Sequence, residues 1–283
     1  MTLVAGSTGA SLKVKDVSLS FGGLAALSQV SFSATPGTVL GIIGANGSGK
    51  TSLLNCIGGV YRPNCGVIEI DGISIIGRRP DALAALGVGR TFQHVEIPRD
   101  VTVLDVALLG RHLHAGRRCQ VLTYGLGLRY IFGVEARERR YAEAALEELE
   151  LSAFSKYLVS DLPYGLAKRV DLARVIAAQP RLLLLDEPAA GLNEIERRKL
   201  ADILRKIAHG GMTVLLIEHD MSFVTQTCGR VLVLAEGRDV YEGTTKDALR
   251  DGAVVATFLG KYTERSTGDL AGHVVSRRTE EEE

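Results

Sequence analysis

The sequence predicts an α/β fold whose core of strands and helices is interrupted in the middle by a helical block. Three observations support this prediction. The glycine-rich turn GANGSGKT (44–51) follows an apolar run at 39–43 and precedes a helical pattern. Strand-length apolar runs recur after residue 180, separated by a charged segment with helical periodicity. Between about 100 and 178 the strand patterns disappear and helical ones replace them.

The elements before residue 99 follow from local patterns. Residues 12–34 alternate apolar and polar positions around Gly22 and Gly23, which indicates strands joined by a turn. A helix is expected over roughly 49–57, directly after the glycine-rich turn. Beyond it, the patterns predict a β-rich stretch at 66–75, a short helix at 81–86 and a strand at 87–92.

The helical block is clearest at 135–151, where Tyr141, Ala145 and Leu149 fall on one face among charged residues. After Pro180 we expect buried parallel strands at 182–185 and 213–217, a charged helix at 194–208, and strands at 231–234 and 239–241. The last residues, ending RRTEEEE, lack apolar periodicity. We therefore expect one domain over 10–262, with a core of 10–98 and 180–262, a helical subdomain at about 99–179, and a disordered tail at 263–283.

Composition excludes several classes of protein. The 33 Lys and Arg residues balance the 33 Asp and Glu residues, whereas nucleic-acid-binding proteins are usually basic. The apolar runs are far shorter than the roughly 20 residues that span a bilayer, and the N-terminus lacks a secretory-signal pattern, so we expect a cytoplasmic protein. The four cysteines show no C-x-x-C spacing, which argues against a zinc site or a disulfide framework.

The turn at 44–51 has the chemistry of a phosphate-binding loop. Glycines let the backbone fold around an anion with its N–H groups pointing inward, and the following helix adds its positive N-terminal end. Lys50 would reach the β- and γ-phosphates, and the Thr51 hydroxyl would ligate Mg²⁺. The alternative is a chance pattern in a plain turn, which the flanking strand and helix disfavour. The candidate nucleotide-binding residues are Gly44, Ala45, Asn46, Gly47, Ser48, Gly49, Lys50, Thr51 and Ser52.

Two acidic residues and a histidine follow two later predicted strands and form a second group of candidate site residues. Asp186 ends the predicted strand at 182–185, at the edge of an open α/β sheet where ligands bind, and can hold Mg²⁺ opposite Thr51. Glu187 would then face the γ-phosphate and act as the base that orients and deprotonates water. His219 follows the next buried strand and is predicted to hold the water and Glu187 in register.

The order of these motifs resembles the nucleotide-binding subunit of an ABC transporter. The matching residues are the loop at 44–51, Gln93, LPYGL at 162–166, the strand ending at Glu187, and His219. Within that superfamily, several segments are similar to the ATP-binding subunits of branched-chain amino-acid importers. They are FGGLAAL (21–27), RTFQHVEI (90–97), LPYG (162–165), LDEPAAGLN (185–193), EGTTKDALRD (242–251) and FLG (258–260).

The resemblance implies a P-loop NTPase fold of the ABC type, with a mixed-sheet core, an antiparallel β subdomain and an inserted helical subdomain. It implies ATP and Mg²⁺ as cofactors. Phe21 takes the place of the aromatic residue that stacks on adenine, and Gln93 matches a catalytic glutamine that touches Mg²⁺ and senses the transport subunit. Gly165 matches the central glycine of the signature motif, whose backbone N–H approaches the γ-phosphate held by the other protomer. The implied metal ligands are Thr51, Gln93 and Asp186.

The same resemblance implies integral-membrane permease subunits, a second ATP-binding subunit (identical or different) and, indirectly, a substrate-binding protein as partners. The chain would then lie at the cytoplasmic face of the cell membrane, with no nucleic acid bound. This sequence departs from the family in its signature motif, which reads LPYGL in place of LSGGQ. Pro163 replaces the serine and has neither a hydroxyl nor a backbone N–H to offer the γ-phosphate. We therefore hypothesise that pairing with a different ATP-binding subunit makes the two sites unequal.

Other cargoes and functions stay open at this point. The same type of ATP-binding subunit also occurs in importers of urea or amides and in exporters of lipid or polysaccharide. Soluble ABC ATPases act on DNA or ribosomes, but they usually carry two nucleotide domains, a coiled-coil insertion or zinc cysteines. A regulator that binds nucleotide without hydrolysis is disfavoured by Glu187 and His219. The segment 111–140 is expected to pack on the domain, with a membrane or permease contact as the alternative.

Overall fold

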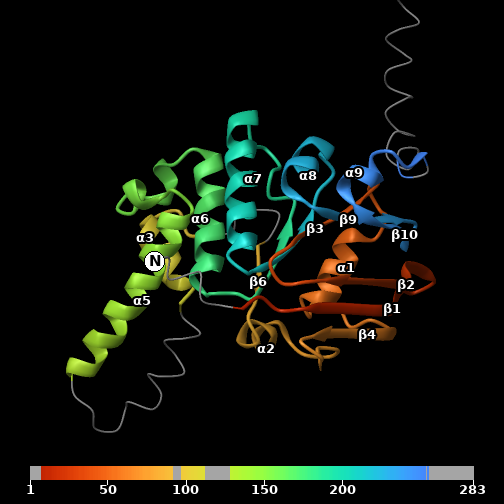
Figure 1. Cartoon of the computed structure of the whole chain (residues 1–283). Coiled ribbons are helices and arrows are strands. Elements are labelled where there is room, and N and C mark those ends of the chain that lie inside the picture. The colour runs from red at the N-terminus through yellow and green to blue at the C-terminus, as the bar shows by residue number, and fades with distance from the viewer. Residues whose placement is uncertain (1–7, 92–96, 112–127, 253, 255–283) are drawn as a thin grey trace, which may run out of the picture.

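The computed structural model describes residues 8–91, 97–111, 128–252 and 254. The helices of residues 103–109, 128–148 and 164–177 lie on the left of the molecule and the antiparallel strands at its lower right, with further helices above those strands (Figure 1). The predicted tail at 263–283 lies outside the described residues. The general arrangement confirms the predicted α/β class, with one antiparallel sheet, one mixed sheet and a run of helices between two strands of the core.

The smaller sheet is antiparallel and has the strand order β2-β1-β4-β5. The buried residues of β1 alternate with more exposed ones on either side of an irregularity between Val14 and Val17, so that Leu12, Val14 and Leu19 join one packed core. The predicted β-rich stretch at 66–75 is divided into two strands. The bounds of the four strands are β1 Leu12–Phe21, β2 Leu24–Ala34, β4 Cys65–Ile70 and β5 Ile73–Ser74.

The larger sheet has the order β10-β9-β3-β8-β7-β6. The pairs from β9 to β6 are parallel, and β10 is added antiparallel at one edge. Every residue of β3, β7 and β8 is buried, as expected for strands covered on both faces. The bounds are β3 Val39–Gly44, β6 Val88–Arg90, β7 Leu182–Asp186, β8 Thr213–Ile217, β9 Arg230–Ala235 and β10 Arg238–Thr244.

The helices fall into two groups. Those of the core are α1 Lys50–Ile57, α2 Pro80–Ala85, α7 Glu194–His209, α8 Met221–Thr227 and α9 Thr245–Ala248. Those between β6 and β7 are α3 Val103–Leu109, α5 Leu128–Glu148 and α6 Tyr164–Ala177, with 3₁₀ turns at Ser152–Phe154 and Val159–Asp161. The helix expected at 135–151 begins seven residues earlier. The helix α3 was predicted only as part of the helical block, and α8 and α9 have no counterpart in the sequence analysis.

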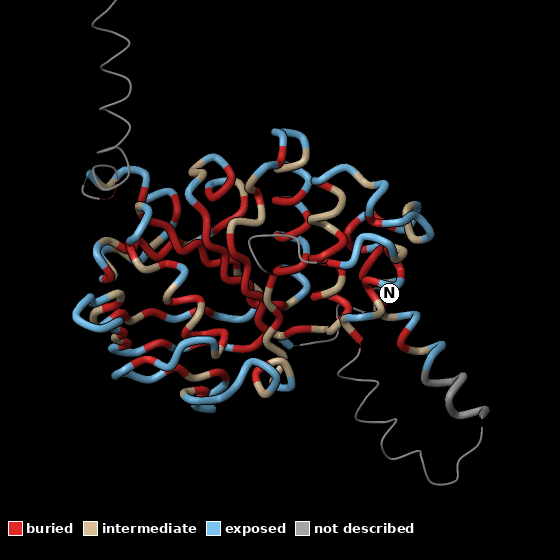
Figure 2. Tube along the Cα trace, turned by 180° about the vertical axis from the view of Figure 1, so that it is seen from behind, coloured by how far each residue is buried: buried red, intermediate tan, exposed pale blue. Residues whose placement is uncertain are grey.

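The larger sheet separates two hydrophobic cores. Alternate residues of β7 point to opposite faces, so Leu183 and Leu185 join the core beneath the helices, whereas Leu182 and Leu184 join the core beneath the antiparallel sheet. Buried chain accordingly fills the centre of the molecule, and exposed chain surrounds it (Figure 2). Because both faces are covered, the strand ends are held in place from two sides.

A buried ion pair joins the helices between β6 and β7. The Arg111 Nε atom donates to the Glu138 carboxylate at 2.6 Å, and its Nη1 atom donates to the Ala177 carbonyl oxygen at 2.6 Å. The guanidinium also lies 4.3 Å from the centre of the Tyr141 ring. Burial by itself would raise the pKa of Glu138, but hydrogen bonds from Arg111 and Arg137 outweigh it and lower that pKa. Arg111, which is itself buried, and the partly exposed Arg137 together compensate the charge of Glu138.

We expect Arg111→Met to lower the free energy of unfolding by about 3–5 kcal/mol, because it leaves a buried carboxylate without its main partner. Urea unfolding followed by circular dichroism measures this change. The matched control is Arg139→Met, whose ion pair with Glu143 is exposed and should change stability by less than about 0.5 kcal/mol. Equal effects of the two substitutions would contradict a structural role for the buried pair.

Candidate nucleotide-binding and catalytic site

Three neighbouring strands of the larger sheet end at the same level. Ile217 of β8 is paired with Ile42 of β3 on one side and with Asp186 of β7 on the other. The segments that follow these strands therefore emerge together at the carboxyl edge of the sheet, where ligands bind in open α/β folds. They are the glycine-rich loop after β3, Glu187 after β7, and His219 after β8.

The glycine-rich loop is packed tightly against its surroundings. A Cβ atom at Gly44 would lie 2.2 Å from the Leu234 carbonyl oxygen, which leaves no room for a side chain. Gly49 has φ of 101° and caps α1, and a Cβ there would lie 2.7 Å from the Ala26 carbonyl oxygen. Because Ala26 belongs to β2, the antiparallel sheet closes directly over the loop.

The loop directs donors toward one place. Gly49 provides no side-chain cap, so the first amides of α1 point outward from the helix end without an intrahelical acceptor. The Lys50 Nζ atom donates to the carbonyl oxygens of Gly44 at 2.9 Å and Ala45 at 2.8 Å. Burial lowers the pKa of Lys50, while Glu187 and Asp186 act in the opposite direction. Within the described residues the buried Ser48 hydroxyl has no hydrogen-bond partner. These features fit a phosphate group.

The acidic residues lie across from the loop. Asp186 is buried, and burial raises its pKa, although Arg90 and Lys50 oppose this shift. The Glu187 amide donates to the Ile217 carbonyl oxygen at 3.0 Å, and the residue has φ of 47°. A Glu187 carboxylate oxygen lies 3.5 Å from the Nδ1 atom of His219, whose side chain is 58% exposed. The structure thus brings Lys50, Asp186, Glu187 and His219 together around one open edge.

These observations define a phosphate loop, an acidic strand end and a histidine on one sheet edge. The family model described as "ABC transporter" matches residues 27–190, which include the loop and both acidic residues. The chain belongs to the ABC transporter family.

Two curated relatives of this ABC protein match over almost their whole length. It is 35% identical over 252 residues to the high-affinity branched-chain amino acid transport ATP-binding protein BraF of Pseudomonas aeruginosa, which covers 88% of this chain and 98% of BraF. It is 34% identical over 257 residues to the protein LivG of Escherichia coli K12, named for the same transport, with the same coverage of 88% and 98%.

A solved structure has the same fold as this ABC protein. It is an ATP-binding cassette of an ABC transporter in its ADP conformation, with a TM-score of 0.76 and 28% sequence identity. The match covers 89% of this chain and 100% of the cassette. In the described part of the chain, no helix is both long enough and apolar enough to cross a membrane.

The remaining predicted site residues of this ABC protein do not all lie at the common strand edge. Phe21 ends β1, is 47% exposed, and meets Tyr61 edge to face at 5.2 Å between ring centres. Thr51 is exposed on the first turn of α1, next to Lys50, and Ser52 is half-buried beside it. Gln93 lies outside the described residues. The structure therefore leaves the contacts of Phe21 with a base, and of Thr51 and Gln93 with a metal, as predictions.

The signature segment opens α6. Pro163 is its N-cap residue and makes no side-chain capping hydrogen bond. Gly165 is buried in the first turn, where a Cβ atom would lie 2.2 Å from a carboxylate oxygen of Glu196. Glu196 in turn belongs to the capping box of α7 with Asn193. A side chain at Gly165 would therefore displace a carboxylate that α7 uses to cap its own N-terminus.

Sequence reasoning missed three charged residues near the site. Glu218 is buried beside His219, Lys168 extends from α6 to the loop after Glu187, and Arg197 forms an ion pair of 2.6 Å with Asp220, the N-cap of α8. Glu218 carries a recognisable signal, since a carboxylate directly after four consecutive apolar residues of a buried strand needs a partner. Lys168 carries none, because one lysine in a helix of mixed composition is usually solvated.

Proposed function

We propose that this chain is the ATP-hydrolysing, energy-coupling subunit of an ABC importer for branched-chain or related amino acids. The observation that supports hydrolysis best is the common strand edge that holds Lys50, Glu187 and His219. The cargo is supported by the names of BraF and LivG, which match over 98% of their length.

Each residue has a defined task in this proposal. The loop amides and Lys50 bind the β- and γ-phosphates, so Lys50 exchanges its two carbonyl acceptors for phosphate oxygens. Thr51, Asp186 and Gln93 would hold Mg²⁺, which neutralises charge on the phosphates when it is bound. Glu187 accepts a proton from the attacking water. His219, at 3.5 Å from Glu187, keeps that carboxylate and the water in register. Phe21 provides the exposed aromatic face for adenine.

The partners follow from the same proposal. Two such domains close around two ATP molecules, each domain presenting Gly165 at the start of α6 to the nucleotide of the other. The amino acid crosses the bilayer through integral-membrane permease subunits, and a substrate-binding protein delivers it. The chain then works at the cytoplasmic face of the cell membrane, and its partner is a second copy or a different ATP-binding subunit.

The test is affinity purification of the Glu187→Gln chain from the membranes of its own host with MgATP. The substitution should trap the closed assembly, so we expect two permease chains, an ATP-binding partner and an amino-acid-binding protein. Recovery of lipid or polysaccharide export components, or of a urea or amide importer, would correct the cargo. Recovery of ribosomal or DNA-repair proteins would contradict a role in transport.

A further inference from the structure

The loop that follows Glu187 is held by a lysine from another part of the molecule. The Nζ atom of Lys168 donates to the carbonyl oxygens of Glu187 at 3.2 Å, Pro188 at 3.4 Å and Ala190 at 2.7 Å. Lys168 lies on α6, the helix that the signature segment opens. One ammonium group thus collects three carbonyl oxygens of the catalytic loop, which uses all three of its donors.

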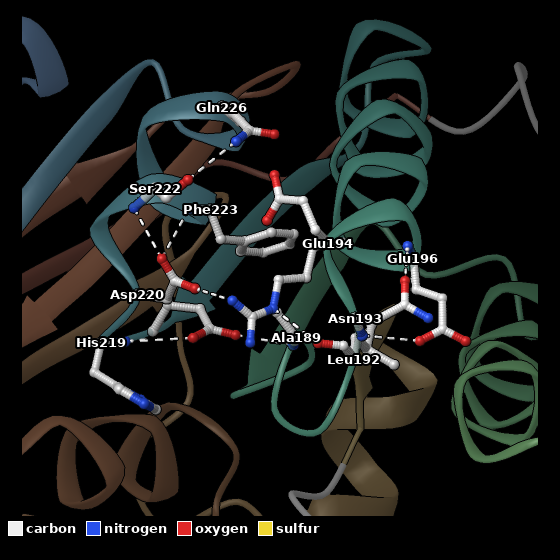
Figure 3. Close-up of polar contacts among 12 residues, drawn as sticks. Ala189, Leu192, Asn193, Glu194, Glu196, His219, Asp220, Ser222, Phe223 and Gln226 are labelled. Carbon is white, nitrogen blue, oxygen red and sulfur yellow. Dashed lines mark hydrogen bonds and ion pairs between the residues drawn. The ribbon is translucent and has the colours of Figure 1, made fainter.

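A carboxylate holds the same loop through one of its backbone amides. An oxygen of Glu218 accepts from the Ala189 N–H at 2.9 Å, and the other oxygen accepts from the His219 N–H at 3.3 Å. Figure 3 labels Ala189 and His219, the two residues whose backbone N–H groups donate to Glu218. Glu218 is 1% exposed, so its contacts are shielded from water. The loop at 187–190 is therefore fixed by two opposite charges, one from α6 and one from the end of β8.

The backbone of Glu187 explains why the loop needs such support. Its φ of 47° lies in the left-handed region, which a residue with a side chain adopts only when its surroundings impose it. The Glu187 carbonyl is bound by Lys168, and its amide is bound by the Ile217 carbonyl oxygen at 3.0 Å. These two contacts define the direction in which the Glu187 side chain leaves the sheet edge.

Burial supports a specific role for the lysine. Lys168 is half-buried, and desolvation lowers its pKa, while Glu218 and Glu187 oppose that shift. The ammonium therefore gives up hydration and takes the three carbonyl oxygens in its place. A lysine that served only solubility would keep its ammonium in water.

We infer that Lys168 is a positioning residue that couples the signature helix to the catalytic carboxylate. Lys168 lies three residues after Gly165, so a shift of α6 on engagement of the partner's nucleotide moves the same helical turn that holds the Glu187 loop. This inference rests on the proposed role of Glu187 as the base. In this inference the lysine acts through the orientation of Glu187 and not through a contact of its own with the nucleotide or the water.

The inference predicts an effect on turnover without an effect on binding. In the full-length chain, Lys168→Met should lower kcat about 10- to 100-fold, because a misplaced base loses its transition-state contact. KM and the affinity for a fluorescent ATP analogue should stay within about 3-fold, since Lys50 and the phosphate loop are untouched. Lys168→Arg should restore most of kcat, because a guanidinium can donate to the same carbonyl oxygens.

Two further variants make the outcomes distinct. Lys199→Met removes an exposed lysine of α7 and should leave all parameters unchanged. Glu187→Gln tests the proposed function itself: full activity in that variant would show that Glu187 is not the base. If Glu187→Gln is inactive but Lys168→Met retains its kcat, the positioning role is wrong. It is also wrong if Lys168→Met lowers analogue binding, kcat and the melting temperature together and Lys168→Arg does not rescue them.

Discussion

Replacing Glu187 by glutamine is expected to lower the rate of ATP hydrolysis by about 10²–10⁴-fold, the usual contribution of a general base. Glutamine has the same shape and still presents an oxygen toward His219, but it cannot accept a proton from water at neutral pH. ATP affinity should stay within about 3-fold, because the Glu187 carboxylate is not part of the phosphate loop. Phosphate release in single-turnover experiments measures the first effect, and titration with a fluorescent analogue measures the second.

The matched control is Glu194→Gln, which neutralises an exposed carboxylate at the start of α7. Glu194 forms an exposed ion pair with Arg198 and lies outside the strand edge, so its hydrolysis rate should equal that of the unmodified chain. A comparable loss of rate in both variants would indicate a general charge effect and would contradict the assignment of Glu187 as base.

Replacing Lys50 by alanine is expected to weaken ATP binding by about 10- to 150-fold. A hydrogen bond to a charged group contributes about 1.5–3 kcal/mol, and each 1.4 kcal/mol is a factor of ten in affinity. The Lys50 ammonium is suited to this role because the loop holds it with two carbonyl oxygens, and because Glu187 and Asp186 oppose the lowering of its pKa by burial. Equilibrium titration with a fluorescent ATP analogue, below the unfolding temperature of the variant, measures the change.

Lys246→Ala is the control for that experiment, because Lys246 is an exposed lysine of the short helix α9. Its removal changes the net charge by the same amount, so its ATP affinity should be unchanged. Unchanged affinity in the Lys50 variant would place the phosphates elsewhere than the loop at 44–51. A loss that disappears at high salt would indicate a long-range charge effect instead of a direct contact.

Much of the fold was predictable because its signals are local. The alternation in β1, the apolar runs of β3, β7 and β8, and the periodicity of α7 each extend over fewer than 20 residues. The short helices α3 and α8 were not predicted as separate elements. In α3 a capping box formed by Thr102 and Asp105 defines the start, and in α8 the Asp220 side chain does so. Such caps become recognisable only when a longer apolar stripe follows them.

The residues of the candidate site also fall into those that the sequence predicted and those that it did not. Lys50, Asp186 and Glu187 were identified from motifs that combine a strand with a few polar residues. Lys168 and Glu218 were not, although they hold the loop that carries Glu187. Their contacts cross 22 and 29 residues of sequence, and no local spacing records them. The roles of Lys168 and Glu218 became visible only in the folded structure, where each side chain lies next to the backbone groups that it binds.

The sequence by itself determined the phosphate loop, the acidic strand end and the order of the main strands and longer helices along the chain, because each depends on neighbouring residues. Only the tertiary structure decided that β8 lies between β3 and β7, which aligns Ile42, Ile217 and Asp186 and brings three separate segments to one edge. It also decided that β2 covers Gly49 and that Glu196 covers Gly165. These contacts form when distant segments bury their apolar faces against one sheet, and that packing is a property of the whole chain.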